Sequence, residues 1–187
     1  MSSQMPAPWR FSVADFHRLG EVGIIKPRDR VELIEGELLS MAPMGSWHAA
    51  TIALLHEALL LGLAGRAIVS SQTPLVLDDY SEPEPDLLVL RPRADRYRDA
   101  LPGPGDVLLL IEVGDTTAHY DRSLKAALYA RHGILELWVV DRQSQVVWVH
   151  RQPQATASRY DEVRRVEHGR LAPMAFPAVG VEIAGLF

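Results

Sequence analysis

The sequence has no cysteine, and lysine is nearly absent from its cations: Lys26 and Lys125 stand beside many arginines. The lack of cysteine excludes a disulfide scaffold and a thiolate zinc site, and it fits a reducing compartment. Arginine keeps its charge at ordinary pH, whereas lysine can shift its pKa and assist proton transfer. A lysine retained at position 125 therefore favours a chemical role for that residue.

Targeting and membrane signals are also missing. No apolar run approaches the roughly 20 residues of a membrane-spanning helix. The first residues, MSSQMPAPWRF, lack the charged and apolar regions of a signal peptide. We therefore expect a cytoplasmic protein with no membrane partner. The formal net charge of −5 argues against non-specific coating of nucleic acid, although a local basic groove is compatible with it.

Three widespread catalytic motifs are absent from the sequence as well. It has no glycine-rich phosphate loop of the G-x-x-x-x-G-K-[ST] type, no G-x-G-x-x-G after a strand and no G-x-S-x-G elbow. Nucleotide hydrolysis by a phosphate loop and serine-dependent esterase chemistry are therefore poorly supported.

The 187 residues are enough for one domain with a sizeable core. Residues 1–10, rich in proline and serine, indicate an N-terminal arm, and 11–187 a single domain. The hydrophobic periodicity predicts an α/β fold with a mixed sheet flanked by helices, an N-terminal hairpin and C-terminal strands. Predicted helices are one capped by Ser12 and running through Leu19, 47–64 capped by Ser46, and 120–131. Predicted strands are a hairpin or bulged strand pair within 30–41 around Glu35-Gly36, then 66–71, 73–77, 87–90, 106–113, 136–141, 146–150 and 159–166.

The stretch from Leu108 to Tyr129 organises the rest of the chain. An apolar run ends in Glu112, and a carboxylate there is costly unless it is paired or binds a cation. Asp86 opens a second apolar strand. If the two strands are antiparallel neighbours, the start of one lies beside the end of the other, and the two carboxylates converge. We expect Leu124, Leu128 and Tyr129 to share the buried face of the following helix.

Lys125 gives this acidic pair a cation from the same helix. Asp121 lies one helical turn before it, so the two share a face. Two carboxylates and a lysine can hold a divalent metal and activate a water, and the carbonyl of Val113 could add an oxygen ligand. The alternative is a structural ion pair of Lys125 with Asp121 or Glu112.

Other polar residues are weaker candidates. His48 and His56 lie on the predicted long helix two turns apart, which is not the spacing of a helical zinc pair. Glu37 belongs to an acidic group in the hairpin, where most glutamates only solubilise. An arginine-rich segment follows the Asp86 strand and could contact phosphates or be a solvated loop; its arginines are Arg91, Arg93, Arg96 and Arg98.

At these residues the chain resembles the Uma2 family, formerly DUF820, of restriction-endonuclease-like proteins in the PD-(D/E)XK nuclease superfamily. The resemblance spans about residues 11–151. Its markers come in order: VELIEGEL at 31–38, His48 at the start of the long helix, EPDLLVL at 84–90, and IEVGDTTAHYDRSLKAALYARHGILELWVVD at 111–141. Each piece alone is weak, and their order and spacing together are specific.

The resemblance implies a central mixed sheet flanked by helices and a Mg²⁺-dependent phosphodiesterase site in which Mn²⁺ could substitute. Asp86 and Glu112 would be metal ligands, Lys125 the catalytic lysine and Glu37 a further acidic site residue. Supporting roles would fall to Asp121, Tyr129, His48 and Asp115. DNA is the expected substrate, and a homodimer is expected because a double-strand cut by a small nuclease often needs two sites.

One position departs from the superfamily pattern. In (D/E)XK the lysine lies two residues after the acid, and here that position is Gly114. Lys125 can take its place only if the helix turns it toward Glu112. This leaves open a catalytically inactive module that binds nucleic acid or protein on a nuclease fold, and hydrolysis of a different phosphate ester.

Overall fold

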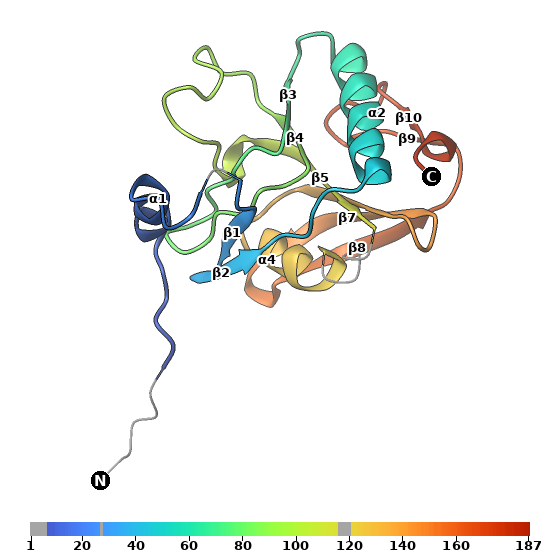
Figure 1. The fold of residues 1–187 in the computed structure, drawn as a ribbon. Coiled ribbons are helices and arrows are strands. Elements are labelled where there is room, and N and C mark those ends of the chain that lie inside the picture. The colour runs from blue at the N-terminus through green and yellow to red at the C-terminus, as the bar shows by residue number, and fades with distance from the viewer. Residues whose placement is uncertain (1–6, 27, 116–120) are drawn as a thin grey trace. The chain divides into compact units, whose positions relative to one another are not determined.

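The computed structural model describes residues 7–26, 28–115 and 121–187, and its chain divides into two compact units. Unit 1 consists of residues 1–43 and 76–83, and unit 2 of residues 44–75 and 84–187. Figure 1 shows their elements.

Unit 1 consists of a helix and a hairpin. Helix α1 spans Val13–Glu21 and begins at Ser12, whose hydroxyl accepts from the amide of Asp15 while the Asp15 carboxylate accepts from the amide of Ser12. This capping box confirms the predicted helix start. Strands β1 (Val31–Ile34) and β2 (Glu37–Ser40) pair antiparallel around the turn Glu35-Gly36, as the sequence predicts.

Unit 2 is built on a six-stranded mixed sheet in the order β3-β4-β5-β6-β7-β8. Only β5 and β6 in it pair in parallel; the other neighbours are antiparallel. The strands are β3 (Ile68–Ser71), β4 (Leu87–Leu90), β5 (Val107–Gly114), β6 (Glu136–Asp141), β7 (Val146–Gln154) and β8 (Arg159–Val166). A short pair, β9 (Arg170–Leu171) and β10 (Val181–Glu182), follows. The α/β class with a mixed sheet is therefore confirmed.

Helices cover the sheet of unit 2 on both faces. Helix α2 (Ser46–Leu63) packs Ile52, Leu55, Leu59 and Leu63 into one core with alternate residues of β4, β5 and β6, among them Ile111 and Val113. Residues that alternate with these point to the opposite face. There a π-helical turn, η2 (Asp121–Lys125), leads into α4 (Ala126–Arg131), which lies against β7 and β8 (Figure 1).

Several predicted boundaries differ from the structure. Gly45, not Ser46, is the N-cap of α2, and Ser46 is its first residue. Residues 73–77 form no strand. Their alternating apolar residues arise because one side of the segment, with Leu75 and Leu77, is buried, although no partner strand pairs with it. Strand β7 extends to Gln154, beyond its predicted end at His150. Leu124 is 49 % exposed, because the π-helical turn contains an extra residue and rotates Leu124 away from the buried face of α4.

Helix α2 also corrects the expectation about membrane length. By length and composition it is apolar enough to cross a membrane, and among the described residues it alone is. Such a helix is weak evidence for a membrane span, because core helices pass the same test. Its stripe Ile52, Leu55, Leu59 and Leu63 is buried in unit 2, while Leu54, Leu60 and Leu61 are exposed.

Candidate active site

Asp86 and Glu112 converge in unit 2 through strand register. Leu87 at the start of β4 lies opposite Ile111 in β5, so the residues just beyond them, Asp86 and Glu112, lie next to one another across the pair. Both residues are buried, at 7 % and 3 % exposure. The strand register therefore places the two residues side by side, as the sequence predicts, and the meeting of their carboxylates stays a prediction.

Two donors hold the Asp86 carboxylate. The amide of Val113 donates to Oδ2 at 2.7 Å, and His48 Nε2 lies 2.8 Å from Oδ1. Because an ionised carboxylate only accepts, Nε2 is the donor in this bond. His48 is in the first turn of α2, so this bond ties the start of the helix to the start of β4. The Asp86 carboxylate is thus fixed at both oxygens.

Glu112 is held from the other side of the sheet. Tyr129 in α4 donates its hydroxyl to Glu112 Oε1 at 2.6 Å, and Lys125 Nζ lies 3.3 Å from the same oxygen. All three side chains are buried. Lys125 is the last residue of the π-helical turn, a rare element that is frequent at functional sites. The helix therefore turns Lys125 toward Glu112. This orientation is required if Lys125 is to replace the lysine that the superfamily pattern has at the position of Gly114.

The donor set suits a hard divalent cation. Among the described residues, no group of three or more histidine, cysteine, aspartate or glutamate side chains is arranged to hold a metal. Mg²⁺ in proteins commonly takes only one or two carboxylates and completes its shell with water and substrate oxygens. Each carboxylate oxygen has two lone pairs, so the bonds from His48 and Val113 leave Asp86 able to bind a cation. The number and type of these ligands fit Mg²⁺, and binding of the ion between them stays a prediction.

The remaining predicted site residues lie in different parts of the chain. Glu37 is exposed at the start of β2 in unit 1, and its part in the site stays a prediction. The side chain of Asp121 lies outside the described residues. Asp115 follows β5 and forms an ion pair with Arg142 at 2.8 Å. The carbonyl of Val113 stays a predicted ligand.

The arginine segment is partly self-neutralised. Arg93 binds both carboxylate oxygens of Asp95, at 2.6 and 2.5 Å, and stacks over Tyr97. This arginine holds the pKa of Asp95 well below its usual range. Arg91, Arg96 and Arg98 are exposed. The exposed positive charge of this segment therefore comes from these three residues. Arg93 instead holds the segment together through its contacts with Asp95 and Tyr97.

The sequence patterns did not single out Trp47, which precedes His48 in α2, or Arg142, which follows β6. The guanidinium of Arg142 lies 5.0 Å from the centre of the Trp47 ring, and the Arg142 amide donates to the carbonyl of Gly114. The available signal was position: Arg142 directly follows β6, whose end lies beside the end of β5.

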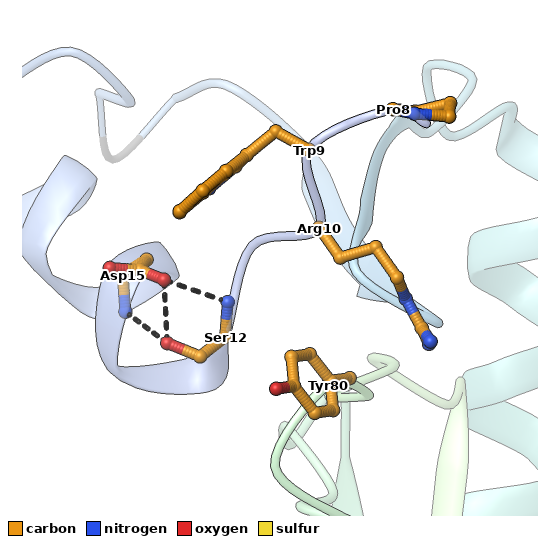
Figure 2. A pocket seen from close by; sticks show the side chains of 6 residues that line it. All are labelled: Pro8, Trp9, Arg10, Ser12, Asp15 and Tyr80. Atoms are coloured by element: carbon orange, nitrogen blue, oxygen red, sulfur yellow. Dashed lines mark hydrogen bonds between the residues drawn. The ribbon is translucent and has the colours of Figure 1, made fainter. Parts of the chain in front are cut away.

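Unit 1 has an open cavity of about 510 Å³. Figure 2 shows Arg10 reaching over Tyr80, with the guanidinium 4.9 Å from the ring centre. Arg10 Nε also donates to the carbonyl of Glu35. Ser12 and Asp15 on its wall are engaged in the capping box of α1. None of the predicted site residues lines this cavity.

Comparison with known proteins supports the nuclease-like fold and then the family. A crystal structure from Anabaena variabilis at 1.96 Å resolution, described as "a putative nuclease belonging to DUF820", superimposes with a TM-score of 0.70 at 17 % identity. The similarity covers 95 % of this chain and 97 % of that one, so the two share a fold. The Uma2 family model, described as "Putative restriction endonuclease", matches residues 13–184. The chain belongs to the Uma2 family. No curated protein matches it.

Proposed function

We propose that the protein is a Mg²⁺-dependent endonuclease that hydrolyses phosphodiester bonds in DNA. The observation that carries the proposal is one buried constellation: Asp86 and Glu112 adjacent across β4 and β5, with Lys125 on Glu112. A stable core has no need to bury two neighbouring carboxylates beside one lysine, because desolvating each charge costs several kcal/mol, on the order of the interaction gained. Membership of the Uma2 family supports the same chemistry.

A bound Mg²⁺ would polarise the phosphate and lower the pKa of a coordinated water. Asp86 and Glu112 would hold the ion, with the Val113 carbonyl as a further ligand. Lys125, beside Glu112, would stabilise negative charge that develops on the phosphate oxygens in the transition state. The oxygen of the attacking water would form a bond to phosphorus and give up its proton to solvent, while the bond to the leaving oxygen would break and that oxygen would take up a proton from solvent.

His48 and Tyr129 would act through the carboxylates. Each donates to one carboxylate and fixes its orientation, as partners of metal ligands commonly do. The exposed arginines Arg91, Arg96 and Arg98 would contact the DNA backbone, since phosphate contacts position a duplex without reading its sequence.

Cleavage of supercoiled plasmid tests the proposal. Wild type should nick DNA with Mg²⁺ or Mn²⁺ and lose this activity with EDTA. Asp86→Asn and Glu112→Gln, which keep the side-chain shape, should abolish nicking without unfolding the protein. Glu57→Gln, at an exposed position of α2, is the matched control and should cleave as wild type does. Nicking that persists in the Asp86→Asn, Glu112→Gln double variant would refute the proposal.

A second candidate is a non-catalytic binding module. Gly114 in the usual lysine position favours it, because the superfamily pattern places a lysine two residues after the acid. Such a module would bind DNA or a protein with no metal-dependent turnover. Comparing DNA, RNA and small phosphodiesters as substrates separates it from hydrolysis of another phosphate ester.

The proposal includes a homodimer, because cutting both strands of a duplex calls for two active centres and two-fold dimers are the commonest oligomers. Sedimentation equilibrium at micromolar concentration, with and without DNA, measures the mass directly. A strictly monomeric protein that only nicks one strand would remove this part of the proposal and leave the chemistry intact.

A further inference from the structure

Three side chains of unit 2 form a cluster that we call the Arg142 cluster: Trp47, Asp115 and Arg142. Arg142 Nη1 lies 2.8 Å from Asp115 Oδ2, and the guanidinium stacks 5.0 Å from the centre of the Trp47 ring. They come from three separate elements: the first turn of α2, the end of β5 and the end of β6. Trp47 packs against the hydrophobic core, and this packing fixes the ring on which Arg142 stacks.

The Arg142 cluster adjoins the carboxylate pair through its immediate chain neighbours. Trp47 precedes His48, which binds Asp86, and Asp115 lies two residues after Val113, whose amide also binds Asp86. The parallel register puts Gly114 opposite Asp141, so β5 and β6 end together at this edge. In sheets with parallel strands, ligands bind beyond the carboxyl ends of those strands.

This edge needs an accessible cation if its ligand is a polyanion. The register brings four acidic residues to this edge: Asp86, Glu112, Asp115 and Asp141. They would repel a phosphate chain unless positive charge offsets them. Lys125 is buried against Glu112, whereas the side chain of Arg142 is 46 % exposed.

The exposure of the ion pair distinguishes it from a structural one. The Asp115 side chain is 40 % exposed, so its bond to Arg142 is in contact with water and contributes little to folding. By contrast, Arg151 binds a Glu136 side chain that is fully buried. Arg142 can therefore exchange Asp115 for another anion while the stack on Trp47 keeps its plane in place. A guanidinium fork matches phosphate oxygens two at a time.

We infer that Arg142 binds a backbone phosphate of the nucleic-acid substrate beside the scissile one. Trp47 orients the guanidinium, and Asp115 is the anion that holds it when no substrate is bound. The inference rests on the proposed nuclease function and adds a substrate-binding residue to it. It assigns Asp115 the role of a competitor for Arg142.

Binding of a fluorescein-labelled DNA duplex by the full chain tests the inference. Anisotropy is measured over a range of salt concentrations with Ca²⁺ in place of Mg²⁺ to limit cleavage. Loss of one phosphate contact makes the slope of log K against log[salt] shallower by about 1. We expect this change, with roughly tenfold weaker binding, for Arg142→Ala. Arg142→Lys should keep the slope, because the charge remains.

Asp115→Asn separates a binding role from a structural one. If Asp115 only competes for Arg142, its loss should tighten DNA binding, whereas a merely structural ion pair would make both variants bind more weakly. Arg164→Ala is the matched control: Arg164 is 50 % exposed and pairs with Glu162 on β8, away from this edge. It should leave the slope unchanged.

The outcomes distinguish this inference from the proposed function. Wild type that binds and cleaves DNA, with Arg142→Ala showing the wild-type slope, overturns the role of Arg142 and leaves the nuclease intact. Weaker binding by Asp115→Asn also overturns it. Wild type that neither binds nor cleaves DNA refutes the proposed function, and the inference fails with it.

Discussion

Tyr129 donates its hydroxyl to Glu112 Oε1 at 2.6 Å across the interface between α4 and β5, and both side chains are buried. The same oxygen has Lys125 Nζ at 3.3 Å. The glutamate that the sequence marks as costly to bury is thus satisfied by two donors of one helical segment. This arrangement makes the helix the element that sets the orientation of the carboxylate.

Tyr129→Phe tests that orientation. The ring keeps its packing and Glu112 loses one donor, so we expect Mg²⁺-dependent cleavage to fall about 10- to 100-fold, the usual effect of losing a partner of a metal ligand. The free energy of unfolding should fall by only about 1 kcal/mol. Plasmid cleavage and urea denaturation measure the two effects. Unchanged cleavage together with lower stability would make Tyr129 a structural residue only.

Lys125→Met tests whether Lys125 and a bound metal ion both offset the negative charge of Glu112. Breaking a buried ion pair from one side costs about 3–5 kcal/mol, because an uncompensated charge remains. A divalent cation would restore positive charge, so Mg²⁺ should raise the Tm of the variant more than that of wild type. Cleavage should fall at least about 100-fold, as when a transition-state donor is removed.

The other lysine supplies the control for that experiment. Lys26→Met removes a lysine at an exposed position of unit 1 and should leave Tm, its response to Mg²⁺ and cleavage unchanged. An equal response of Tm to Mg²⁺ in wild type and Lys125→Met would show that the ion does not bind near Glu112.

His48→Ala tests the support of Asp86. It removes the donor at Oδ1 and leaves the Val113 amide at Oδ2. We expect the affinity for Mn²⁺, measured by calorimetry, to fall about 10- to 100-fold. His56→Ala changes a partly buried histidine two turns along α2 and is the matched control. Equal affinities in both variants would remove His48 from the site.

The side-by-side placement of Asp86 and Glu112 was predictable because it depends on two robust rules. Side chains alternate along a strand, and antiparallel neighbours bring the start of one strand to the end of the next. Predicting the positions of Asp86 and Glu112 required only the order of two apolar runs in the sequence. The hairpin around Glu35-Gly36 was equally predictable from the sequence, since Gly36 lies at φ +83°, where glycine is favoured.

What the sequence could not supply is geometry that depends on a distant partner or on an irregular turn. The prediction put Leu124 on the buried face by assuming a regular α-helix, and the π-helical turn exposes it while turning Lys125 inward. The Arg142 cluster joins residues 47, 115 and 142, which have no shared periodicity. Such contacts arise from tertiary packing.

The pH dependence of stability has a source in unit 1. Burial raises the pKa of Glu82, and the nearby His17, at 2.8 Å, opposes this effect. The folded protein therefore holds this proton more tightly than the unfolded chain. The resulting stability is fully present below the unfolded pKa of 4.5 and is lost as pH rises through the raised pKa. Glu82→Gln should remove this loss.

Urea denaturation followed between pH 4 and pH 8 (roughly the range over which a raised carboxyl pKa acts) measures that difference. The stability of wild type minus that of Glu82→Gln should fall with rising pH. His17→Asn is the second variant: it removes the opposing effect, raises the pKa of Glu82 further and moves the fall to higher pH. A difference that rises with pH would mean that Glu82 is stabilised as a carboxylate in the fold.

The last prediction concerns the arginine segment, where Asp95 neutralises Arg93 and accepts from the amides of Tyr97 and Asp99. Asp95→Asn removes one negative charge and releases a guanidinium. If this segment contacts the DNA backbone, the salt slope of duplex binding should steepen by about 1, because one more cation becomes available. Arg96→Ala, which removes an exposed cation, should make it shallower by about the same amount.

Arg159→Ala gives the reference for both changes, because Arg159 is exposed on β8 and pairs with Asp161 at 3.1 Å. It should not alter the slope. Weaker binding by Asp95→Asn with an unchanged slope would mean that the Arg93–Asp95 pair maintains the shape of the loop and that Arg93 does not reach DNA. Wild-type slopes in both Asp95→Asn and Arg96→Ala would exclude the segment from the interface, because charge that meets phosphate must release counterions.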